Sequence, residues 1–516
     1  MAATLRKWFL VLVLSGSGAA LGWLWLFSEK QAQDRVLGTY ATLLLTGAAL
    51  LVWVLALSGW AARARLGILA ALALLAGFGW LCLEVRGVTG DFVPIVAWRF
   101  APRPPLAEAR PRDPVEPEAA GPAARDWPQF LGPDRDGTLR GVGLERDWAA
   151  HPPRLLWRRP VGSAWSGFAV GAGLAVTQEQ RGELECVVAY DLAGGEPRWI
   201  WSAAARFESV VAGNGPRATP AIAGDKVFAL GATGTLACLD LASGNAEWSR
   251  DVLRDAGAEN LGWGLASSPL VTGSTVIVGA GAGGPTLLAY DAESGERVWA
   301  AGHDVAGFSS PQVATLAGVP QLLAFNAGSV SAHDLEDGHL LWEVPWSDRN
   351  PNVAQPRVLD GDRVLVSSGY GVGSTLFEVA RSAGDTGGLE ARAVWRSRAL
   401  KAKFANFVDR EGFVYGLDDG ILACLDAKDG ERAWKSGRYG HGQLLLVDDV
   451  LLIQAESGAV VLVAATPDAH RELARFDALE GKTWNSPTLA APYLLVRNDL
   501  EAACYELPLA GDPVSR

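Results

Sequence analysis

The chain has 516 residues, and 21 of them are Trp. Its formal charge of −12 is unevenly spread, because residues 1–110 hold ten Lys/Arg and five Asp/Glu, which leaves −17 for the remainder. An acidic main domain lacks the basic surface that phosphate backbones need, so nucleic acid is excluded as a partner. Five Cys in a chain of this length do not make a disulfide scaffold.

Three apolar runs open the chain, and each is close to the length of a helix that crosses a bilayer. They cover approximately Trp8–Phe27, Leu37–Leu57 and Leu66–Leu83. We therefore expect a three-span transmembrane helical region over residues 1–90. A cleaved signal peptide is the alternative for the first run, because Arg6 and Lys7 precede it. Both topologies place the following domain outside, so we expect an inner (cytoplasmic) membrane protein with a periplasmic, extracytoplasmic main domain.

A Pro/Ala-rich linker is predicted at residues 91–125. Seven Pro lie within residues 101–125, a composition typical of a semi-rigid, extended spacer. We expect residues 126–154 to form a leader that packs on the main domain, residues 155–507 to form that domain, and residues 508–516 to form a tail.

One sequence unit recurs along the main domain: an apolar strand ending in Asp, followed by x3-Gly-x3-Trp. Its five full copies are Asp191/Gly195/Trp199, Asp240/Gly244/Trp248, Asp291/Gly295/Trp299, Asp334/Gly338/Trp342 and Asp426/Gly430/Trp434. Trp395 ends a copy with a longer hairpin, Leu473 ends a degenerate copy, and Trp157 is an isolated last strand. The Asp and Gly suit a tight turn, and the flat Trp ring suits a position between neighbouring sheets.

These terminal positions recur about every 45 residues, which suits a four-stranded propeller blade. The sequence therefore predicts an all-β fold: an eight-bladed β-propeller of four-stranded antiparallel blades. We expect the strand of Trp157 to complete the last blade, so that pairing of N- and C-terminal strands closes the ring. Seven blades remain the alternative if the degenerate copy is a loop.

The repeat resembles that of the PQQ-like (pyrroloquinoline-quinone repeat) β-propeller family. The upstream motif Asp126-Trp127-Pro128-Gln129-Phe130-Leu131-Gly132 also resembles a leader found before such propellers. The family includes quinoprotein dehydrogenases and the propeller subunit of the outer-membrane β-barrel assembly machine. The resemblance therefore implies either a quinone enzyme or a binding module.

The enzyme alternative is a PQQ-dependent quinoprotein dehydrogenase that donates electrons to membrane quinone. That resemblance implies a vicinal Cys–Cys disulfide on the quinone and Glu, Asn and Asp ligands to calcium. The chain has no adjacent cysteines and no Cys-x2-Cys or His-x3-His run for zinc. We therefore predict no catalytic residues, metal or cofactor, and consider PQQ with calcium only under this alternative.

Polar and aromatic residues are dense where the chain leads into each predicted innermost strand, and these segments meet at one mouth of a propeller channel. The residues are Trp165, Arg217, Trp263, Asn352, Gln355, Lys401, Lys403, Asn406, His441, Lys482, Trp484 and Asn485. Four of them are cationic in an acidic domain, which favours an anionic small molecule or an acidic segment of a partner. Polar groups that merely solvate a channel are the alternative.

We accordingly expect a membrane-anchored, exported propeller that acts as a non-catalytic binding or scaffold module for protein partners at the cell envelope. A sensor that signals through its spans on binding an anion is a third interpretation. It is disfavoured because the sequence shows no cytoplasmic domain to receive a signal.

Overall fold

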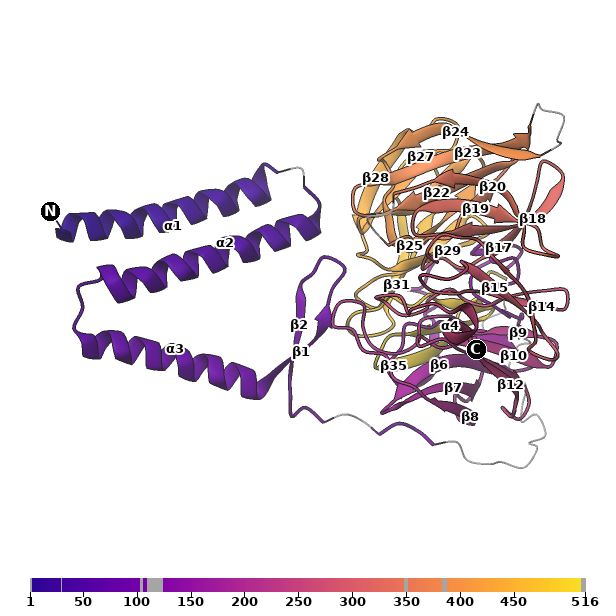
Figure 1. Cartoon of the computed structure of the whole chain (residues 1–516), viewed down its shortest axis with the longest axis horizontal. Coiled ribbons are helices and arrows are strands. Elements are labelled where there is room, and N and C mark those ends of the chain that lie inside the picture. Colours follow the sequence, from indigo (N-terminus) through magenta and orange to yellow (C-terminus); the bar gives the residue numbers. More distant parts are fainter. Residues whose placement is uncertain are drawn as a thin grey trace. The chain divides into compact units, whose positions relative to one another are not determined.

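The computed structural model describes residues 2–28, 30–102, 105–108, 124–347, 351–382 and 388–511. The chain divides into two compact units. One is a mainly helical unit of residues 1–104 together with Ser209–Ala212, and the other is a larger β unit formed by the rest (Figure 1).

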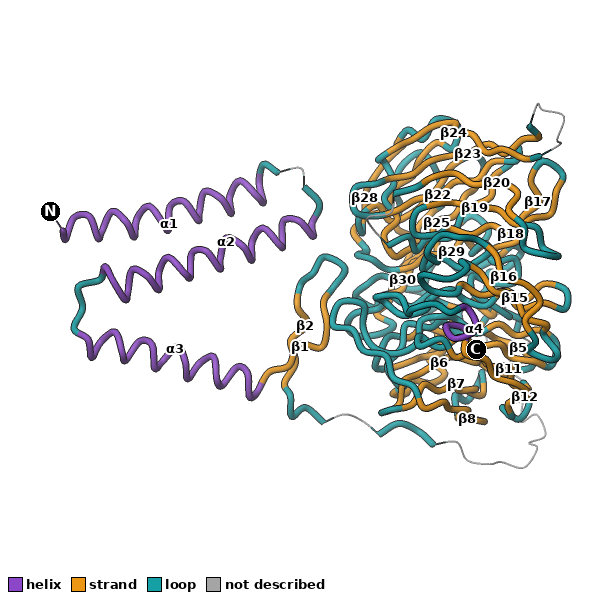
Figure 2. The backbone as a smooth tube through the Cα atoms, in the orientation of Figure 1, coloured by secondary structure: helices purple, strands orange, loops and turns teal. Residues whose placement is uncertain are grey.

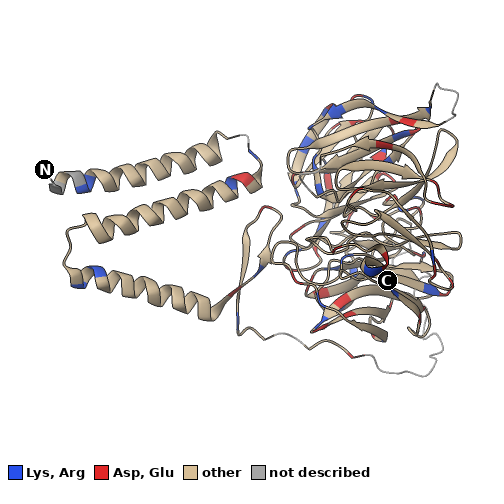
Figure 3. Ribbon diagram, in the orientation of Figure 1, with Lys and Arg blue, Asp and Glu red and all other residues tan. Residues whose placement is uncertain are grey.

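The N-terminal unit contains three long helices: α1 (Ala2–Leu26), α2 (Ala32–Val52), extended by the π-helical turn η1 (Trp53–Leu57), and α3 (Ala62–Cys82). Each is long and apolar enough to cross a membrane, by length and composition. Charged side chains are confined to the helix ends, as Figure 3 shows. A hairpin of β1 (Leu83–Val88) and β2 (Pro94–Trp98) follows α3 directly.

The β unit is an eight-bladed propeller of antiparallel sheets, and this confirms the predicted blade count. Strands and loops make up nearly all of it, and α4 (Val252–Ala256) is a short helix on a connection (Figure 2). Each blade runs from an inner to an outer strand. The first four blades are β5 (Ala169–Gly171), β6 (Leu174–Arg181), β7 (Leu184–Asp191), β8 (Pro197–Ala204); β9 (Ala221–Ala223), β10 (Lys226–Leu230), β11 (Thr235–Asp240), β12 (Ala246–Asp251); β13 (Leu270–Thr272), β14 (Thr275–Gly279), β15 (Leu287–Asp291), β16 (Arg297–Ala301); and β17 (Gln312–Leu316), β18 (Val319–Phe325), β19 (Ser329–His333), β20 (Leu340–Pro345).

The last four blades follow the same order, with two additions from the N-terminal side of the β unit. They are β21 (Arg357–Leu359), β22 (Arg363–Ser368), β23 (Gly373–Arg381), β24 (Leu389–Ser397); β25 (Ala402–Arg410), β26 (Phe413–Asp418), β27 (Ile421–Asp426), β28 (Arg432–Arg438); β29 (Gln443–Val447), β30 (Val450–Gln454), β31 (Ala459–Ala464), β32 (Glu472–Asp477); and β33 (Thr488–Ala490), β34 (Tyr493–Arg497), β35 (Glu501–Glu506). β3 (Thr138–Leu139) adds to the seventh blade, and β4 (Arg154–Pro160) pairs with β35 in the eighth. The degenerate repeat copy is thus a true blade.

In most blades the repeat Trp packs against the hairpin of the next blade. Trp199 in the first blade is 6% exposed, and its indole N–H donates to the carbonyl of Leu241 at 2.8 Å. A Cβ on Gly244, which has a φ of +74°, would lie 2.5 Å from this ring. Trp157, Trp248, Trp299 and Trp395 stand in the same way over Gly195, Gly295, Gly338 and Gly430. The repeat therefore joins blades as well as turning strands.

Trp342 departs from this pattern. Its indole N–H donates at 2.5 Å to Oε1 of Gln321, which belongs to its own blade. The fifth blade follows it and has the lengthened hairpin, so that hairpin lacks the repeat glycine.

Trp434 in the sixth blade keeps the hydrogen bond to the next blade but has no repeat glycine beneath its ring. Its indole N–H donates to the carbonyl of Thr466 in the seventh blade at 3.0 Å. That blade carries the degenerate repeat copy, which has Ala469 in place of the repeat glycine, and the ring of Trp434 meets the ring of His470 at 5.9 Å between centroids. The Trp434 side chain is only partly buried. Trp248 and Trp395, which lie over repeat glycines, are partly buried as well, so these three rings are less enclosed between neighbouring sheets than expected.

The leader crosses the inner strands at the end of the channel where these strands finish. Trp127, which is 1% exposed, forms a bridge with Val170 in the first blade. Pro128 accepts from the amide of Ile222 in the second, and Gly137 accepts from that of Leu446 in the seventh. One short segment therefore ties together blades that are not neighbours.

A candidate functional site at the channel mouth

The mouth is the end of the channel where the inner strands begin. Ten of the twelve predicted site residues lie on the segments that lead into these strands, and the other two lie within an inner strand. Trp165 precedes β5, Arg217 precedes β9, Trp263 precedes β13, Asn352 and Gln355 precede β21, Lys401 precedes β25, His441 precedes β29, and Lys482, Trp484 and Asn485 precede β33, while Lys403 and Asn406 lie within β25.

The amide side chains among them join neighbouring blades. Asn352 donates to the carbonyls of Asn326 at 2.7 Å and Ala327 at 2.9 Å, and it accepts from the hydroxyl of Ser368 at 2.6 Å. Oδ1 of Asn406 accepts from the backbone N–H of Gln355 at 2.7 Å. These contacts connect the fourth blade to the fifth and the fifth to the sixth.

The same kind of hydrogen bond continues around the whole ring. The remaining junctions are made by Gly167 N to Thr219 Oγ1, Thr219 N to Ser268 Oγ, Ser268 N to Ser310 Oγ, Gln443 Nε2 to the carbonyls of Phe404 and Trp484, and Asn485 Nδ2 to the carbonyls of Ala164 and Ser166. We call this set the inner belt. Buried polar groups need partners, and the belt supplies many of them. Oδ1 of Asn485, Oε1 of Gln443 and both polar side-chain atoms of Gln355 are nevertheless buried without a hydrogen-bond partner. The belt also gives Asn352, Asn406 and Asn485 a structural role.

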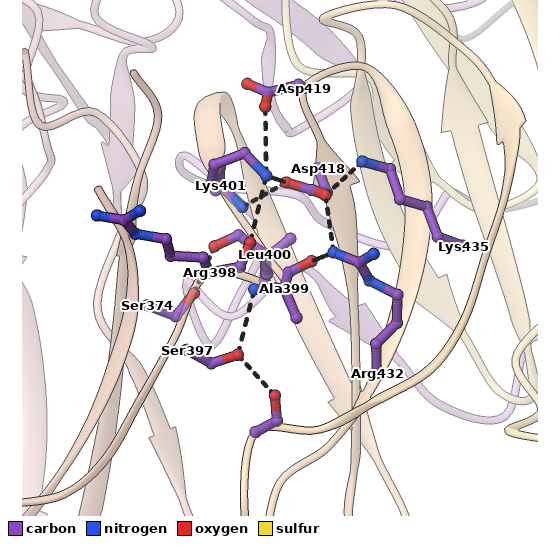
Figure 4. A network of polar contacts seen from close by, with 12 residues as sticks. Ser374, Ser397, Arg398, Ala399, Leu400, Lys401, Asp418, Asp419, Arg432 and Lys435 are labelled. Carbon is purple, nitrogen blue, oxygen red and sulfur yellow. Dashed lines mark hydrogen bonds and ion pairs between the residues drawn. The ribbon is translucent and has the colours of Figure 1, made fainter. Parts of the chain in front are cut away.

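Lys401 belongs to an ion-pair network within the sixth blade and the segment that leads into it (Figure 4). The carboxylate of Asp418 is fully buried and accepts from the ammonium of Lys401, from Lys435 at 2.5 Å and from Arg432 at 3.4 Å. Asp419 lies 3.3 Å from the Lys401 ammonium, and burial raises the pKa of this carboxyl. Asp418 is the last residue of β26 and Asp419 follows it in the turn, and sequence reasoning missed both because they are separated from Lys401 in the chain. Lys401 is therefore charge-paired.

Aromatic side chains form a continuous cluster across the mouth, which we call the aromatic roof. It comprises Trp165, Trp263, Phe308, Phe404, His441 and Trp484. The ring of Phe404 lies 5.1 Å from that of Trp484 and 5.8 Å from that of Trp263, measured between centroids. Phe404 belongs to the sixth blade and Trp263 leads into the third, so the roof crosses the channel axis.

An irregular strand places Phe404 at the centre of the roof. The pairing of β25 with β26 is interrupted between Ala402 and Phe407, which takes Lys403 to Asn406 out of the ladder. Such interruptions re-aim side chains next to functional sites. Sequence reasoning missed Phe404 and Phe308 because an apolar residue near a strand start looks like part of the core.

Cationic side chains lie on the faces of the aromatic rings. The ammonium of Lys482 is 4.4 Å from the centroid of Trp165 and 4.2 Å from that of Trp484. The ammonium of Lys403 is 4.8 Å from the ring of Tyr370. Ring faces carry negative charge density and attract cations. Burial nevertheless lowers the pKa of Lys482 below its ordinary value.

The residues at the mouth do not fit a calcium-bound quinone. Asp418 is committed to three cations, and Glu456 accepts from the Trp484 indole N–H and from the backbone N–H of His441, both at 2.9 Å. Within the described part of the chain, the three-ligand group with metal-binding spacing is Asp334, Asp337 and His339, on an outer hairpin of the fourth blade. All five cysteines are free thiols.

Comparisons with known proteins find relatives that share the propeller fold described above. The family model described as "Outer membrane protein assembly factor BamB" matches residues 145–258 and 185–436. A protein of that name from Shewanella oneidensis is 32% identical over 227 residues, which is 43% of this chain and 44% of the relative, so the chain spans less than half of that relative's length.

Two solved structures share the fold at low sequence identity. BamB from Moraxella catarrhalis superposes with a TM-score of 0.50 at 17% identity, covering 69% of this chain and all of the other. Quinohemoprotein alcohol dehydrogenase from Comamonas testosteroni gives a TM-score of 0.53 at 13% identity, covering 74% and 81%. The same fold therefore occurs in a protein named for assembly and in an enzyme. The fold alone does not distinguish a scaffold from an enzyme, so that distinction depends on the chemistry of the site.

Proposed function

Since the chain belongs to the PQQ-like propeller family described as outer membrane protein assembly factor BamB, we propose that it is a non-catalytic scaffold for protein partners in the cell envelope. The propeller supplies a rigid ring, and the channel mouth supplies the binding surface.

The aromatic roof is the observation that carries this proposal. Trp263, Phe308, Phe404 and Trp484 are partly exposed, although they contact one another across the mouth. Trp and Tyr dominate the binding energy of protein interfaces, because they bury large areas at a low cost in conformational entropy. A cluster of such rings supported by an inner belt of hydrogen bonds is typical of a preorganised interface.

We further propose that α1, α2 and α3 anchor the chain in the inner membrane, with the propeller on the periplasmic side. The length and apolar composition of the three helices support this. The pairing of β4 with β35 supports the companion proposal that N- and C-terminal strands close the ring, which would keep the mouth rigid.

A photo-crosslinking experiment tests the scaffold role. A photoreactive phenylalanine replaces Trp263 at the mouth, and a matched variant carries it at Lys428, on the opposite end of the sixth blade. Full-length protein is irradiated in native membranes, and the adducts are identified by mass spectrometry. We expect one defined set of envelope proteins at position 263 that is absent at position 428. Identical adducts at both positions would contradict a specific interface at the mouth.

A further inference from the structure

A β-hairpin with one apolar face follows the third long helix directly. β1 begins at Leu83, the residue after the end of α3, and pairs with β2 so that Leu83 lies opposite Trp98 and Val85 lies opposite Val96. Side chains alternate between the two faces of a strand, so these four share one face. Each of them is between 42% and 54% exposed. The structure therefore leaves a row of large apolar side chains on this face uncovered.

The charged side chains of the two strands lie on the opposite face. Nε of Arg86 and Oε1 of Glu84 form an ion pair there at 2.7 Å, and Ala97 is the cross-strand partner of Glu84. An isolated two-stranded hairpin is marginally stable in water at best, and burial of its apolar face is the main force that can stabilise it. The pattern therefore favours an apolar surface against one face of the hairpin and water against the other.

The base of the hairpin is fixed against the last turns of α3. The ring of Trp98 lies 6.4 Å from that of Phe78 between centroids, and the guanidinium carbon of Arg99 lies 5.9 Å from the centroid of Trp80. The backbone N–H of Arg99 also donates to the carbonyl of Cys82, the last residue of α3, at 2.8 Å. Trp rings and basic side chains at the end of an apolar span are typical of the boundary between membrane and water.

The tip of the hairpin contacts the second long helix. The hydroxyl of Tyr40 donates to the carbonyl of Phe92, in the turn between β1 and β2, at 3.2 Å. Tyr40 lies about 12 Å along α2 from its first residue, Ala32. A short connection joins α2 and η1 to α3, so the start of α2 and the end of α3 lie at the same end of the helical unit (Figure 1). Base and tip of the hairpin are therefore both held beside apolar helices.

We propose that the β1–β2 hairpin lies in the membrane interface, with its apolar face inserted at the boundary between lipid headgroups and acyl chains. This proposal rests on the proposed anchoring of α1, α2 and α3 in a membrane, and it adds a fourth element to that anchor. Continuity with α3 identifies lipid as the occupant, because Phe78 and Trp80 are exposed at the same helix end and the hairpin face prolongs their apolar surface.

The expected depth follows from the same balance that governs amphipathic helices at a membrane surface. Such helices bury their apolar face about 5–10 Å below the headgroups, and the charged face stays in water. In the hairpin, Trp98 and Val96 then contact lipid, and the ion pair of Glu84 with Arg86 faces the headgroups and water. The hairpin thereby fixes the orientation of the chain where it leaves the last helix.

Depth-dependent fluorescence quenching tests this placement. Full-length protein with Cys82→Ala and Val96→Cys is labelled with a nitrobenzoxadiazole dye and reconstituted into vesicles of phosphatidylcholine and phosphatidylglycerol. The four remaining thiols are buried, so the folded protein carries one dye. Nitroxide lipids quench a dye close to them, and iodide quenches a dye in water. We expect strong quenching by a nitroxide near the headgroup, weaker quenching by a nitroxide deep in the acyl chain, and protection from iodide.

Two matched positions serve as controls. Ala97→Cys places the dye on the opposite face of the same strand, where both nitroxide lipids should quench it less than at position 96. Lys428→Cys places it at an exposed position of the propeller and gives the iodide quenching expected in water. Thermal melting of each labelled variant confirms that it is folded.

Iodide quenching at position 96 as strong as at position 428 would place the face in water and overturn the proposal. Protection at position 96 from iodide and from both nitroxide lipids would show that protein covers the face, and would overturn lipid as the occupant. A dye at Leu72→Cys, in the middle of α3, separates the two proposals. Deep-nitroxide quenching at position 72 without lipid quenching at position 96 refutes the hairpin and leaves the anchoring in place, whereas no lipid quenching at either position refutes both.

Discussion

Replacing Gly244 with Ala tests whether the repeat Trp holds neighbouring blades together. The glycine has a φ of +74°, and an added Cβ would lie 2.5 Å from the ring of Trp199. Gly224 is a matched control in the same blade, because its φ is +62° and a Cβ there meets nothing within 4 Å. Both changes cost about 1 kcal/mol for the left-handed backbone, and only Gly244→Ala also displaces the indole.

The additional cost at Gly244 follows from what the indole loses. Overpacking of a well-packed site costs about 1–3 kcal/mol. Separation of Trp199 from the carbonyl of Leu241 costs about 1 kcal/mol more. We expect a difference of about 2–4 kcal/mol between the two variants. The propeller has roughly 350 residues, and an unfolding entropy of about 2.1 cal/mol/K per residue converts this difference into about 3–5 °C in Tm.

Thermal unfolding of the full chain in detergent, followed by near-ultraviolet circular dichroism, gives both Tm values. The effect should also be non-additive. In a Trp199→Ala background the ring is gone, so Gly244→Ala should cost no more than Gly224→Ala. Equal Tm values for the two single variants, or full additivity with Trp199→Ala, would refute the inter-blade role of the ring.

Three further changes probe the leader, the ion-pair network and the thiols. Burial raises the pKa of Asp448, but backbone N–H groups of the leader bind this carboxylate and hold its pKa below the ordinary value. The ionised carboxylate therefore stabilises the folded protein above about pH 4, and this stabilisation is lost as the pH falls. Asp448→Asn should therefore speed trypsin cleavage after Arg140 at pH 7; an unchanged rate would contradict the clamp. Asp418→Asn should lower the stability by about 3–5 kcal/mol, because three cations lose their buried counter-charge, and a Tm change under 1 °C would count against this. Burial raises the pKa of Cys186 to about 11, so iodoacetamide at pH 8 should label this thiol, which is 3% exposed, only after denaturation, as mass spectrometry can show.

The fold was largely predictable because the repeat encodes a local geometry. Asp, Gly and Trp at fixed spacing specify a turn and an outer strand, and the period then gives eight blades. Trp342 and Trp434 show the limit of this reasoning. Their spacing is regular, but neither faces a repeat glycine on the next hairpin. Trp342 donates to Gln321 in its own blade instead, and the ring of Trp434 meets that of His470. Pairing between blades depends on both members of the contact, which one repeat copy cannot show.

The site was predictable in position and less so in role. Residues that lead into inner strands do converge, because the ring makes them converge. The amides Asn352, Asn406 and Asn485 look like ligand-binding groups in sequence, yet their hydrogen bonds join blades. Phe404 shows the reverse error: its sequence position suggests a residue of the hydrophobic core, but an irregular strand places it in the aromatic roof. Contacts across a channel axis leave no signal at any single position.

The pairing of β4 with β35 has a consequence for how the protein is made. β4 leaves the ribosome some 340 residues before its partner, and β3 of the leader is made about 310 residues before the strand of the seventh blade with which it pairs. The eighth blade therefore cannot assemble until the C-terminal strands have been synthesised. Until then β4 presents an unpaired edge that other strands can capture. Folding of this protein should accordingly depend on chaperones that shield nascent chains.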